Sequence, residues 1–281
     1  MDPALLQTAE NLVAGAFVVL LMLSVGLDLS LSGLAATLRR PGGLLAGLLS
    51  GYLLVPLVAA GLAHLLELGP GARAGLLLCA VAPGGPMGAY LALSARGDVA
   101  LAVTLVLVFN VANTLLIPLG LSVLDVPVPT EDSGYLWDMA FMIVATQLVP
   151  LSVGVLVRLA RPQVARRLQA ATSWTANALL LVFGVAVVVL EGGRFLQAGW
   201  PTVLAVLGAV LASLVLGWVV SPPRRETRVA LASVGVIHSS SACVLLASAW
   251  FPDPATLLTV LTWAGIMFVV GVGAARWMRR A

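Results

Sequence analysis

The chain has 281 residues, of which 60% are hydrophobic and only 10% are charged, and its formal net charge is +3. A mean hydropathy of +1.07 excludes a water-soluble globular protein and indicates an all-α polytopic membrane protein. The hydrophobic stretches follow one another without a linker that could separate two units. We therefore expect a single transmembrane domain over residues 1–281.

The N-terminal stretch MDPALLQTAEN carries Asp2 and Glu10 but no basic residue. It lacks the positive n-region of a secretory signal peptide, so the first hydrophobic segment is expected to stay in the mature protein. Nine segments are long enough to cross a hydrocarbon core of about 30 Å as helices. They are predicted at 11–29, 42–65, 72–94, 98–124, 136–160, 172–190, 197–220, 227–250 and 255–275. Pro56, Pro118 and Pro150 fall inside three of them and are predicted to distort the helix.

The third segment is interrupted by the motif VAPGGPMGAYL at residues 81–91. Each proline of this motif removes a helical hydrogen bond, and irregular backbone at membrane depth survives only where protein or a wet cavity covers it. We therefore predict that this break forms part of a translocation site and that its freed carbonyls serve a small polar solute. The candidate residues are Pro83, Gly84, Gly85, Pro86, Met87 and Gly88.

The eighth segment is interrupted in a similar way by SVGVIHSSSAC at residues 233–243. The candidate binding residues here are His238, Ser239, Ser240 and Ser241. The two broken segments lie five crossings apart, so they run in opposite directions. Paired interruptions in two inverted halves are typical of secondary transporters with a binding site near the bilayer midplane. The sequence thus predicts inverted repeats at about 11–124 and 136–275.

Polar side chains inside the spans add candidates. Asn110 and Asn113 of the fourth span either form interhelical hydrogen bonds or contact the substrate, and the sequence leaves both interpretations open. For His238 we favour a role in the cavity over a neutral core histidine, because ionisable groups at bilayer depth mark functional sites. Cys79 and Cys243 are expected to be small buried hydrophobic residues. No metal or cofactor site is predicted.

Charge orients the predicted helices, because all fifteen basic residues are arginines and only Arg73 and Arg194 fall in predicted outer segments. The remaining arginines lie in alternate loops and in the C-terminal tail. By the positive-inside rule, the N-terminus is predicted outside and the C-terminus in the cytoplasm of an integral plasma membrane protein, in bacteria the inner membrane. The positive charge thus reports topology and does not indicate nucleic-acid binding.

At the two breaks the sequence resembles the bile acid:sodium symporter family. APGGPMGAYLALSARGDVALAV is similar to the family's Pro-Gly-Gly-Thr-Ala-Ser-Asn segment and its continuation, and SVGVIHSSSA to its Glu-Val-Gly-x-Gln-Asn-Ser segment. The resemblance implies panel and core domains, two broken helices that cross, and inward transport of organic anions with Na⁺.

The chain departs from the family pattern where the resemblance places the sodium ligands. Na⁺ is a hard cation that requires several oxygen ligands, and most of these oxygens are missing here. We therefore expect a transporter whose coupling ion is a proton more readily than sodium, with His238 as the proton carrier. The family's sodium-site positions fall on Gly51, Gly88, Ala89, Ala102, Val106 and Ser233.

Two other functions remain open beside transport of a small organic solute, for which an organic anion is the expected class. One is export of arsenite or a related oxyanion, with Cys79 or Cys243 as a soft ligand, although the arsenite carriers lack the Pro-Gly-Gly run. The other is a membrane-embedded hydrolase that uses His238 and a neighbouring serine, but no acid is placed to orient this histidine. We therefore expect no enzymatic activity.

Overall fold

The computed structural model describes residues 15–16, 18–27, 41–126, 135–175, 178–179 and 199–280. Within these ranges all regular secondary structure is helical, apart from one isolated β-bridge. The expected span at 172–190 lies almost wholly outside the described residues. Of the expected span at 11–29, the short apolar helix Val18–Leu27 is described.

Five helices in the described residues are long and apolar enough to cross a membrane, and each overlaps a span predicted from the sequence. The first and third contain one π-helical turn each, η1 and η2. The five are Pro41–Leu65, made of α3 (Pro41–Leu49), η1 (Ser50–Leu54) and α4 (Val55–Leu65); α7 (Val99–Val123); Trp137–Ala160, within α8 (Tyr135–Ile143), η2 (Val144–Leu148) and α9 (Val149–Ala160); α11 (Gly199–Val219); and α14 (Pro254–Arg280).

The third and eighth predicted spans are each split into two helices, as their sequences indicate. The third consists of α5 (Pro70–Ala80) and α6 (Met87–Ser94), and the eighth of α12 (Arg225–Val236) and α13 (Ser240–Trp250). Between the helices of each pair the chain is irregular over three to six residues. Both predicted breaks are therefore confirmed.

Two of the three prolines inside the spans follow a π-helical turn. Pro56 is the second residue of α4 and Pro150 the second residue of α9. At the end of η1 the N–H of Val55 bonds to the carbonyl of Ser50, five residues back. The wider turn relieves the clash that a proline ring makes with a helical carbonyl. The predicted distortions are thus present at Pro56 and Pro150, whereas α7 continues through Pro118 without a break.

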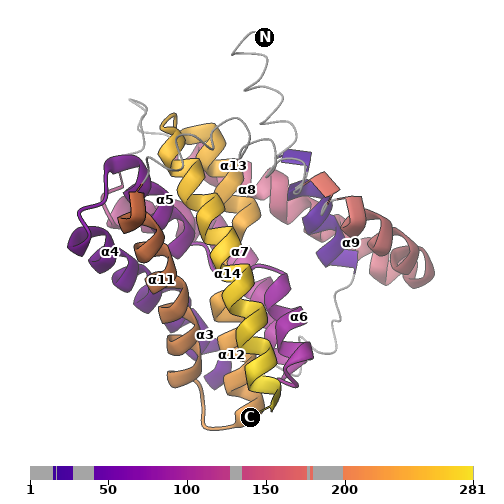
Figure 1. The fold of residues 1–281 in the computed structure, drawn as a ribbon. Helices are drawn as coiled ribbons and strands as arrows, with labels where there is room; N and C mark the ends of the chain where they lie inside the picture. Colours follow the sequence, from indigo (N-terminus) through magenta and orange to yellow (C-terminus); the bar gives the residue numbers. More distant parts are fainter. Residues whose placement is uncertain are drawn as a thin grey trace.

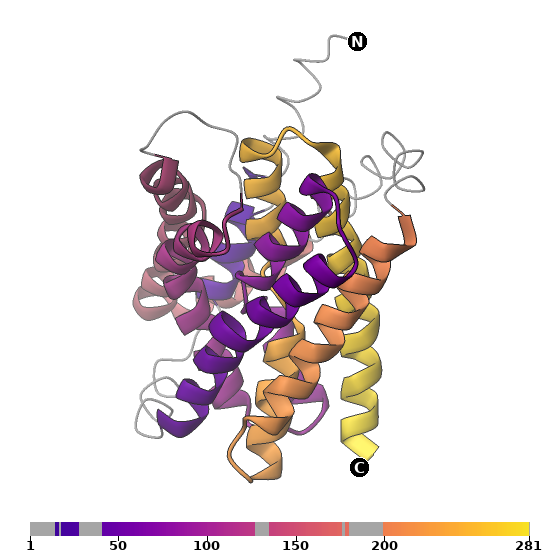
Figure 2. The same cartoon turned by 90° about the vertical axis from the view of Figure 1, so that its left-hand side faces the viewer.

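The helices form two groups (Figure 1). In Figure 1, Val18–Leu27 lies with α8 and α9 on one side, α4, α5 and α11 lie on the other, and α13 and α14 run between them; Figure 2 shows α14 beside α11. Val18–Leu27 and α9 meet through glycines, since a Cβ on Gly26 would lie 3.0 Å from the Cα of Gly154. The largest apolar cluster joins α4, α5, α11 and α14 and also includes Met139 and Ile143 of α8, and the fully buried Trp263 of α14 belongs to it. This packing places the two breaks in the interior.

Candidate functional site

The two breaks bind each other through their backbones. Pro83 and His238 form an antiparallel β-bridge. The N–H of Gly85 donates to the carbonyl of Ile237 at 3.0 Å, and the N–H of Ser239 donates to the carbonyl of Ala82 at 2.7 Å. Helix ends leave unpaired backbone groups that are costly in a membrane, so this exchange stabilises the crossing of the broken spans.

The asparagines of α7 hold the first break. The Nδ2 of Asn110 donates to the carbonyl of Gly84 at 3.0 Å, and the Nδ2 of Asn113 donates to the carbonyl of Pro83 at 3.0 Å. The hydroxyl of Tyr52, in η1, lies 2.7 Å from the Oδ1 of Asn113 and donates to it. Both asparagines thus bond to the first break, and the bond between Asn113 and Tyr52 is interhelical, whereas contact with a substrate stays a prediction.

These bonds correct one expectation about the first break. The carbonyls of Ala82, Pro83 and Gly84 all accept hydrogen bonds from protein donors. The expectation that the prolines leave these carbonyls free for a solute is therefore wrong. Pro86 has no N–H for the carbonyl of Ala82, four residues back, and Ser239 supplies that donor instead.

Glycine is required at the break because neighbouring backbone approaches it closely. Gly84 has a φ of +93°, which L side chains rarely adopt, and a Cβ there would overlap the Cβ of Phe109. A Cβ on Gly85 would lie 2.5 Å from the carbonyl oxygen of His238. A Cβ on Gly88 would lie 2.8 Å from the Cα of Val234. These glycines allow the two broken spans to touch.

His238 lies inside the crossing with a relative exposure of only 2%. Its ring meets the ring of Trp263 edge-on, with centroids 4.9 Å apart, and its backbone N–H donates to the Sδ of Met267 at 3.4 Å. Both ring nitrogens are buried and have no hydrogen-bond partner among the described residues. Buried polar atoms are normally paired, and these two nitrogens are an exception. The imidazole can therefore exchange a proton or bind a polar solute without first losing a hydrogen bond of its ring.

Other buried polar side-chain atoms around the crossing also have no hydrogen-bond partner within the described ranges. They are Ser50 Oγ, Thr114 Oγ1, Ser233 Oγ, Ser239 Oγ, Ser241 Oγ and Trp263 Nε1. The hydroxyl of Ser240 is 3.9 Å from the Sδ of Met267. By contrast Met87, at the start of α6, is 38% exposed and is not enclosed at the crossing. The crossing thus offers hydroxyl, imidazole and indole groups.

The positions that the family resemblance assigns to sodium are closely packed. A Cβ on Gly51 would lie 3.1 Å from the side chain of Pro83 and 3.3 Å from the ring of Phe109. Ala102 and Val106 belong to an apolar cluster with Phe109, and Ala89 packs against it. At these positions the side chains provide one oxygen, the hydroxyl of Ser233.

The cavity at the crossing is small. Its volume is about 10 Å³, and Ser50, Gly51, Pro83 and Phe109 are among its lining residues. This space matches a single water molecule. The crossing is therefore closed to an organic solute in this conformation.

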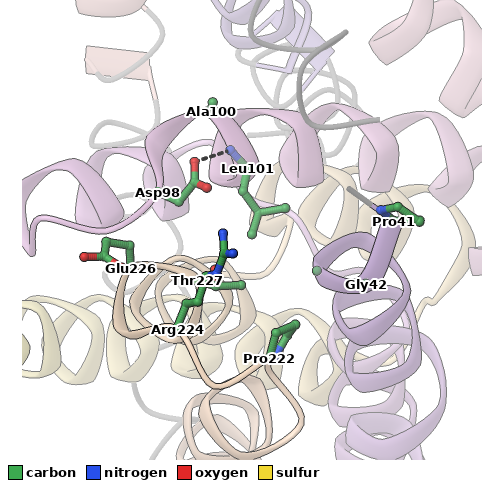
Figure 3. Close-up of a pocket in the computed structure, with 10 residues that line it drawn as sticks. Pro41, Gly42, Asp98, Ala100, Leu101, Pro222, Arg224, Glu226 and Thr227 are labelled. Carbon is green, nitrogen blue, oxygen red and sulfur yellow. Dashed lines mark hydrogen bonds between the residues drawn. The ribbon is translucent and has the colours of Figure 1, made fainter. Parts of the chain in front are cut away.

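Two larger cavities open at opposite ends of the molecule, and none of the predicted site residues lines either. One of about 760 Å³ lies where α3, α7 and α12 begin (Figure 3). The other, of about 330 Å³, lies where α5, α11 and α14 begin. Each contains an aspartate that caps a helix. Asp98 accepts the N–H of Leu101 at 3.0 Å, and Asp253 accepts the N–H of Ala255 at 2.9 Å.

Sequence reasoning missed several residues of the site. Trp263 and Met267 contact His238 in the second break, and Tyr52 bonds to Asn113, which holds the first break. The position of Trp263 in the middle of a span, away from the membrane interface, is a signal that could have indicated it. Gln147, in η2, is fully buried with both amide atoms unpartnered among the described residues. Cys79 and Cys243 are buried, as expected.

Comparison with known proteins identifies the family. The model of the sodium bile acid symporter family matches residues 16–198. Human sodium/bile acid cotransporter 4 is 26% identical over 191 residues, which cover 67% of this chain and 44% of that protein. Human P3 protein is 29% identical over 240 residues, or 79% of this chain and 48% of that protein.

A bacterial relative is the uncharacterized sodium-dependent transporter YocS of Bacillus subtilis, which is 27% identical over 189 residues, or 65% of this chain and 56% of that protein. The chain thus spans about half the length of these curated relatives. The matched region contains the first break and the asparagines of α7, and it extends over most of the described helices. The chain is an integral membrane protein that belongs to the sodium bile acid symporter family, a family of transporters and not of enzymes.

Proposed function

We propose that this protein is a secondary transporter of a small organic solute, preferably an organic anion, and that it works by alternating access. The observation that carries this proposal is the hydrogen-bonded crossing of α5–α6 with α12–α13 in the interior. Broken helices that meet at membrane depth are costly unless the irregular backbone serves a site. Unpartnered hydroxyls and an imidazole lie at this crossing.

The two large cavities support an inverted repeat. One is lined by the starts of α3, α7 and α12, and the other by the starts of α11, α14 and α5. When the chain is divided into halves at about 11–124 and 136–275, α3 corresponds to α11, α7 to α14 and α5 to α12. The two members of each pair lie five predicted spans apart. Asp98 and Asp253 then occupy equivalent capping positions. We propose that the whole chain forms one transport domain of nine spans.

Helix dipoles favour an anion at the crossing. α6 and α13 both begin at a break, so the positive ends of two helices meet there. Pro86 and Ser239 precede these helices, and neither forms a side-chain capping bond. A carboxylate headgroup could accept hydrogen bonds from these N-termini and from the serine hydroxyls.

We further propose that transport does not use sodium and that a proton on His238 replaces it. Two of the relatives named above, cotransporter 4 and YocS, carry sodium in their names, so this chain would differ from them. The support is local: glycine, alanine and valine occupy five of the six family sodium positions, and Pro83, Phe109 and Val234 closely surround two of them. A histidine needs no coordination shell, and its ring can bind and release a proton.

Uptake by proteoliposomes under an imposed gradient tests both parts. We expect that an inward proton gradient drives concentrative uptake of an organic acid and that a Na⁺ gradient alone does not. His238→Gln should abolish the response to pH while leaving exchange of internal for external substrate. His64→Gln is the matched control, because His64 is exposed near the end of α4.

The results separate the alternatives. Concentrative uptake driven by Na⁺ alone would overturn the proposed coupling but not the transport function. Unchanged pH dependence in His238→Gln would show that the histidine does not carry the proton. Absence of both uptake and exchange for a broad panel of organic anions would argue against the proposed substrate class.

A further inference from the structure

Two segments distant in sequence meet at one end of the molecule. They are the loop and first turns of α12, after α11, and the last two turns of α14 (Figure 1). The guanidinium of Arg225 donates a hydrogen bond to the carbonyl of Met278. The rings of Trp218 and Trp277 lie 6.4 Å apart between centroids. Tertiary packing therefore joins two arginine-rich segments.

The joined surface is strongly basic, and we call it the arginine patch. Its residues are Arg225, Arg228, Arg276, Arg279 and Arg280, with Trp218 and Trp277. Apart from Arg228, these arginines are exposed. The acids nearest to it are Glu226 and Asp98, which line the adjacent cavity together with Arg224 (Figure 3). Within the described ranges, no carboxylate forms a salt bridge with an arginine of the patch.

One arginine of the patch is held in place and retains a free donor. The guanidinium carbon of Arg228 lies 6.0 Å from the centre of the Trp218 ring, within the range of a cation–π interaction. Its Nε is buried and has no hydrogen-bond partner among the described residues. Trp277 is 64% exposed beside it. A planar donor beside one half-buried and one exposed indole ring suits a phosphate that is attached to an apolar chain.

The location of the arginine patch decides what kind of anion it meets. α11 and α14 are both long enough to cross the membrane, and the patch lies at the ends of both. Tryptophan and arginine at the end of a spanning helix lie at the level of the lipid headgroups. Basic pockets between helices at this level recognise anionic headgroups, and each arginine contributes about 1 kcal/mol.

We propose that the arginine patch is a binding site for an anionic phospholipid headgroup, such as that of phosphatidylglycerol. The headgroup phosphate binds Arg228 and the arginines at the end of α14, and the acyl chains lie along α11 and α14. The bound lipid joins the C-terminal helix to α12, whose other end forms the crossing. This proposal depends only on the membrane location and not on the substrate or the coupling ion.

Native mass spectrometry of the purified full-length chain tests the proposal. Phosphatidylglycerol and phosphatidylcholine with identical acyl chains are added together, and the retained lipids are counted. We expect preferential retention of phosphatidylglycerol. The double variant Arg276→Gln/Arg279→Gln should lower the affinity for phosphatidylglycerol about 20–30-fold, because each arginine contributes a factor of about five. Arg166→Gln/Arg167→Gln removes two exposed arginines elsewhere and should retain wild-type affinity.

A thermal unfolding assay keeps the test independent of variant folding. Phosphatidylglycerol should raise the melting temperature of delipidated wild-type protein more than phosphatidylcholine does. Equal effects of the two lipids, or equal losses in both double variants, would overturn the proposal. Equal stabilisation by soluble glycerol 3-phosphate would also overturn it, because the site would then bind a free anion and not a lipid.

Discussion

Asn113 links three elements through one side chain. Its amide nitrogen donates to the carbonyl of Pro83 in the first break, and its amide oxygen accepts from the hydroxyl of Tyr52 in η1. Asn113 itself is on α7 and is fully buried. Because both groups of the amide are used, no other side chain of similar size could replace it without loss.

We expect Asn113→Leu to lower the free energy of unfolding by about 1–3 kcal/mol, because a buried carbonyl and a buried hydroxyl lose a partner. Tyr52→Phe should cost less, about 0.5–1.5 kcal/mol, since it removes the hydroxyl itself and leaves the amide oxygen of Asn113 without its donor. Thermal or denaturant unfolding in detergent measures both changes.

Thr262→Val serves as the control for Asn113→Leu. The hydroxyl of Thr262 bonds only to the carbonyl of Leu258 within its own helix, so its loss should change stability little. An Asn113→Leu variant as stable as this control would show that the bonds to Pro83 and Tyr52 do not hold the break in place.

Gly84 tests the steric requirement of the break. Gly84→Ala introduces a Cβ at a φ of +93° and against Phe109, so we expect a smaller folded fraction in the membrane. Gly61→Ala is the matched control, because a Cβ there meets nothing within 4 Å. Equal folded yields of the two variants would contradict the steric argument.

At the scale of elements, glycine contacts decide how Val18–Leu27 packs. A Cβ on Gly154 of α9 would lie 2.5 Å from the carbonyl oxygen of Leu23, so the two helices touch along their backbones. η2 precedes α9 and contains the buried Gln147. This pair of helices therefore approaches closely next to a turn with an unpartnered amide.

We expect Gly154→Val to separate Val18–Leu27 from α9 and to lower the melting temperature by several degrees, as overpacking usually costs about 1–3 kcal/mol. Gly273→Val on α14 is the control, since a Cβ at Gly273 has no neighbour within 4 Å. The measurement is thermal unfolding of both variants in the same detergent. A Gly154→Val melting temperature equal to that of the control would argue against this close contact.

At the scale of the whole molecule, the arginine distribution predicts the orientation. α14 ends with Arg279 and Arg280, and Arg224 and Arg225 lie at the start of α12 at the same end of the molecule (Figure 1). From the positive-inside rule we expect this end in the cytoplasm. We accordingly expect the cavity of about 760 Å³ to open to the cytoplasm and that of about 330 Å³ to open outside.

A reporter that is active only in the cytoplasm should therefore work when it is fused after Arg280 and fail when it is fused to the N-terminus. The reason is the energetic preference for arginine in cytoplasmic loops. A periplasm-specific reporter provides the complementary control. Activity of the cytoplasmic reporter at the N-terminus alone would reverse the orientation of both broken spans.

The sequence by itself determined the class of the protein, the five long spans and the positions of both breaks. These features follow from local physics, because hydrophobic length sets a membrane helix and a Pro-Gly-Gly-Pro stretch interrupts one wherever it occurs. The resemblance at the same two breaks indicated the family, and the matched family model confirmed it. The burial of Asn113 and His238 was also predictable, since both lie within apolar segments.

Only the tertiary structure decided what the breaks bind. The carbonyls of Pro83 and Gly84 are paired with side chains 26 to 30 residues away, and Gly85 pairs with Ile237 from the other half of the chain. The contact of His238 with Trp263 and the meeting of Arg225 with the end of α14 likewise depend on how helices pack. Local sequence specifies which backbone groups a helix leaves unpaired, but the three-dimensional neighbours determine which partners satisfy them.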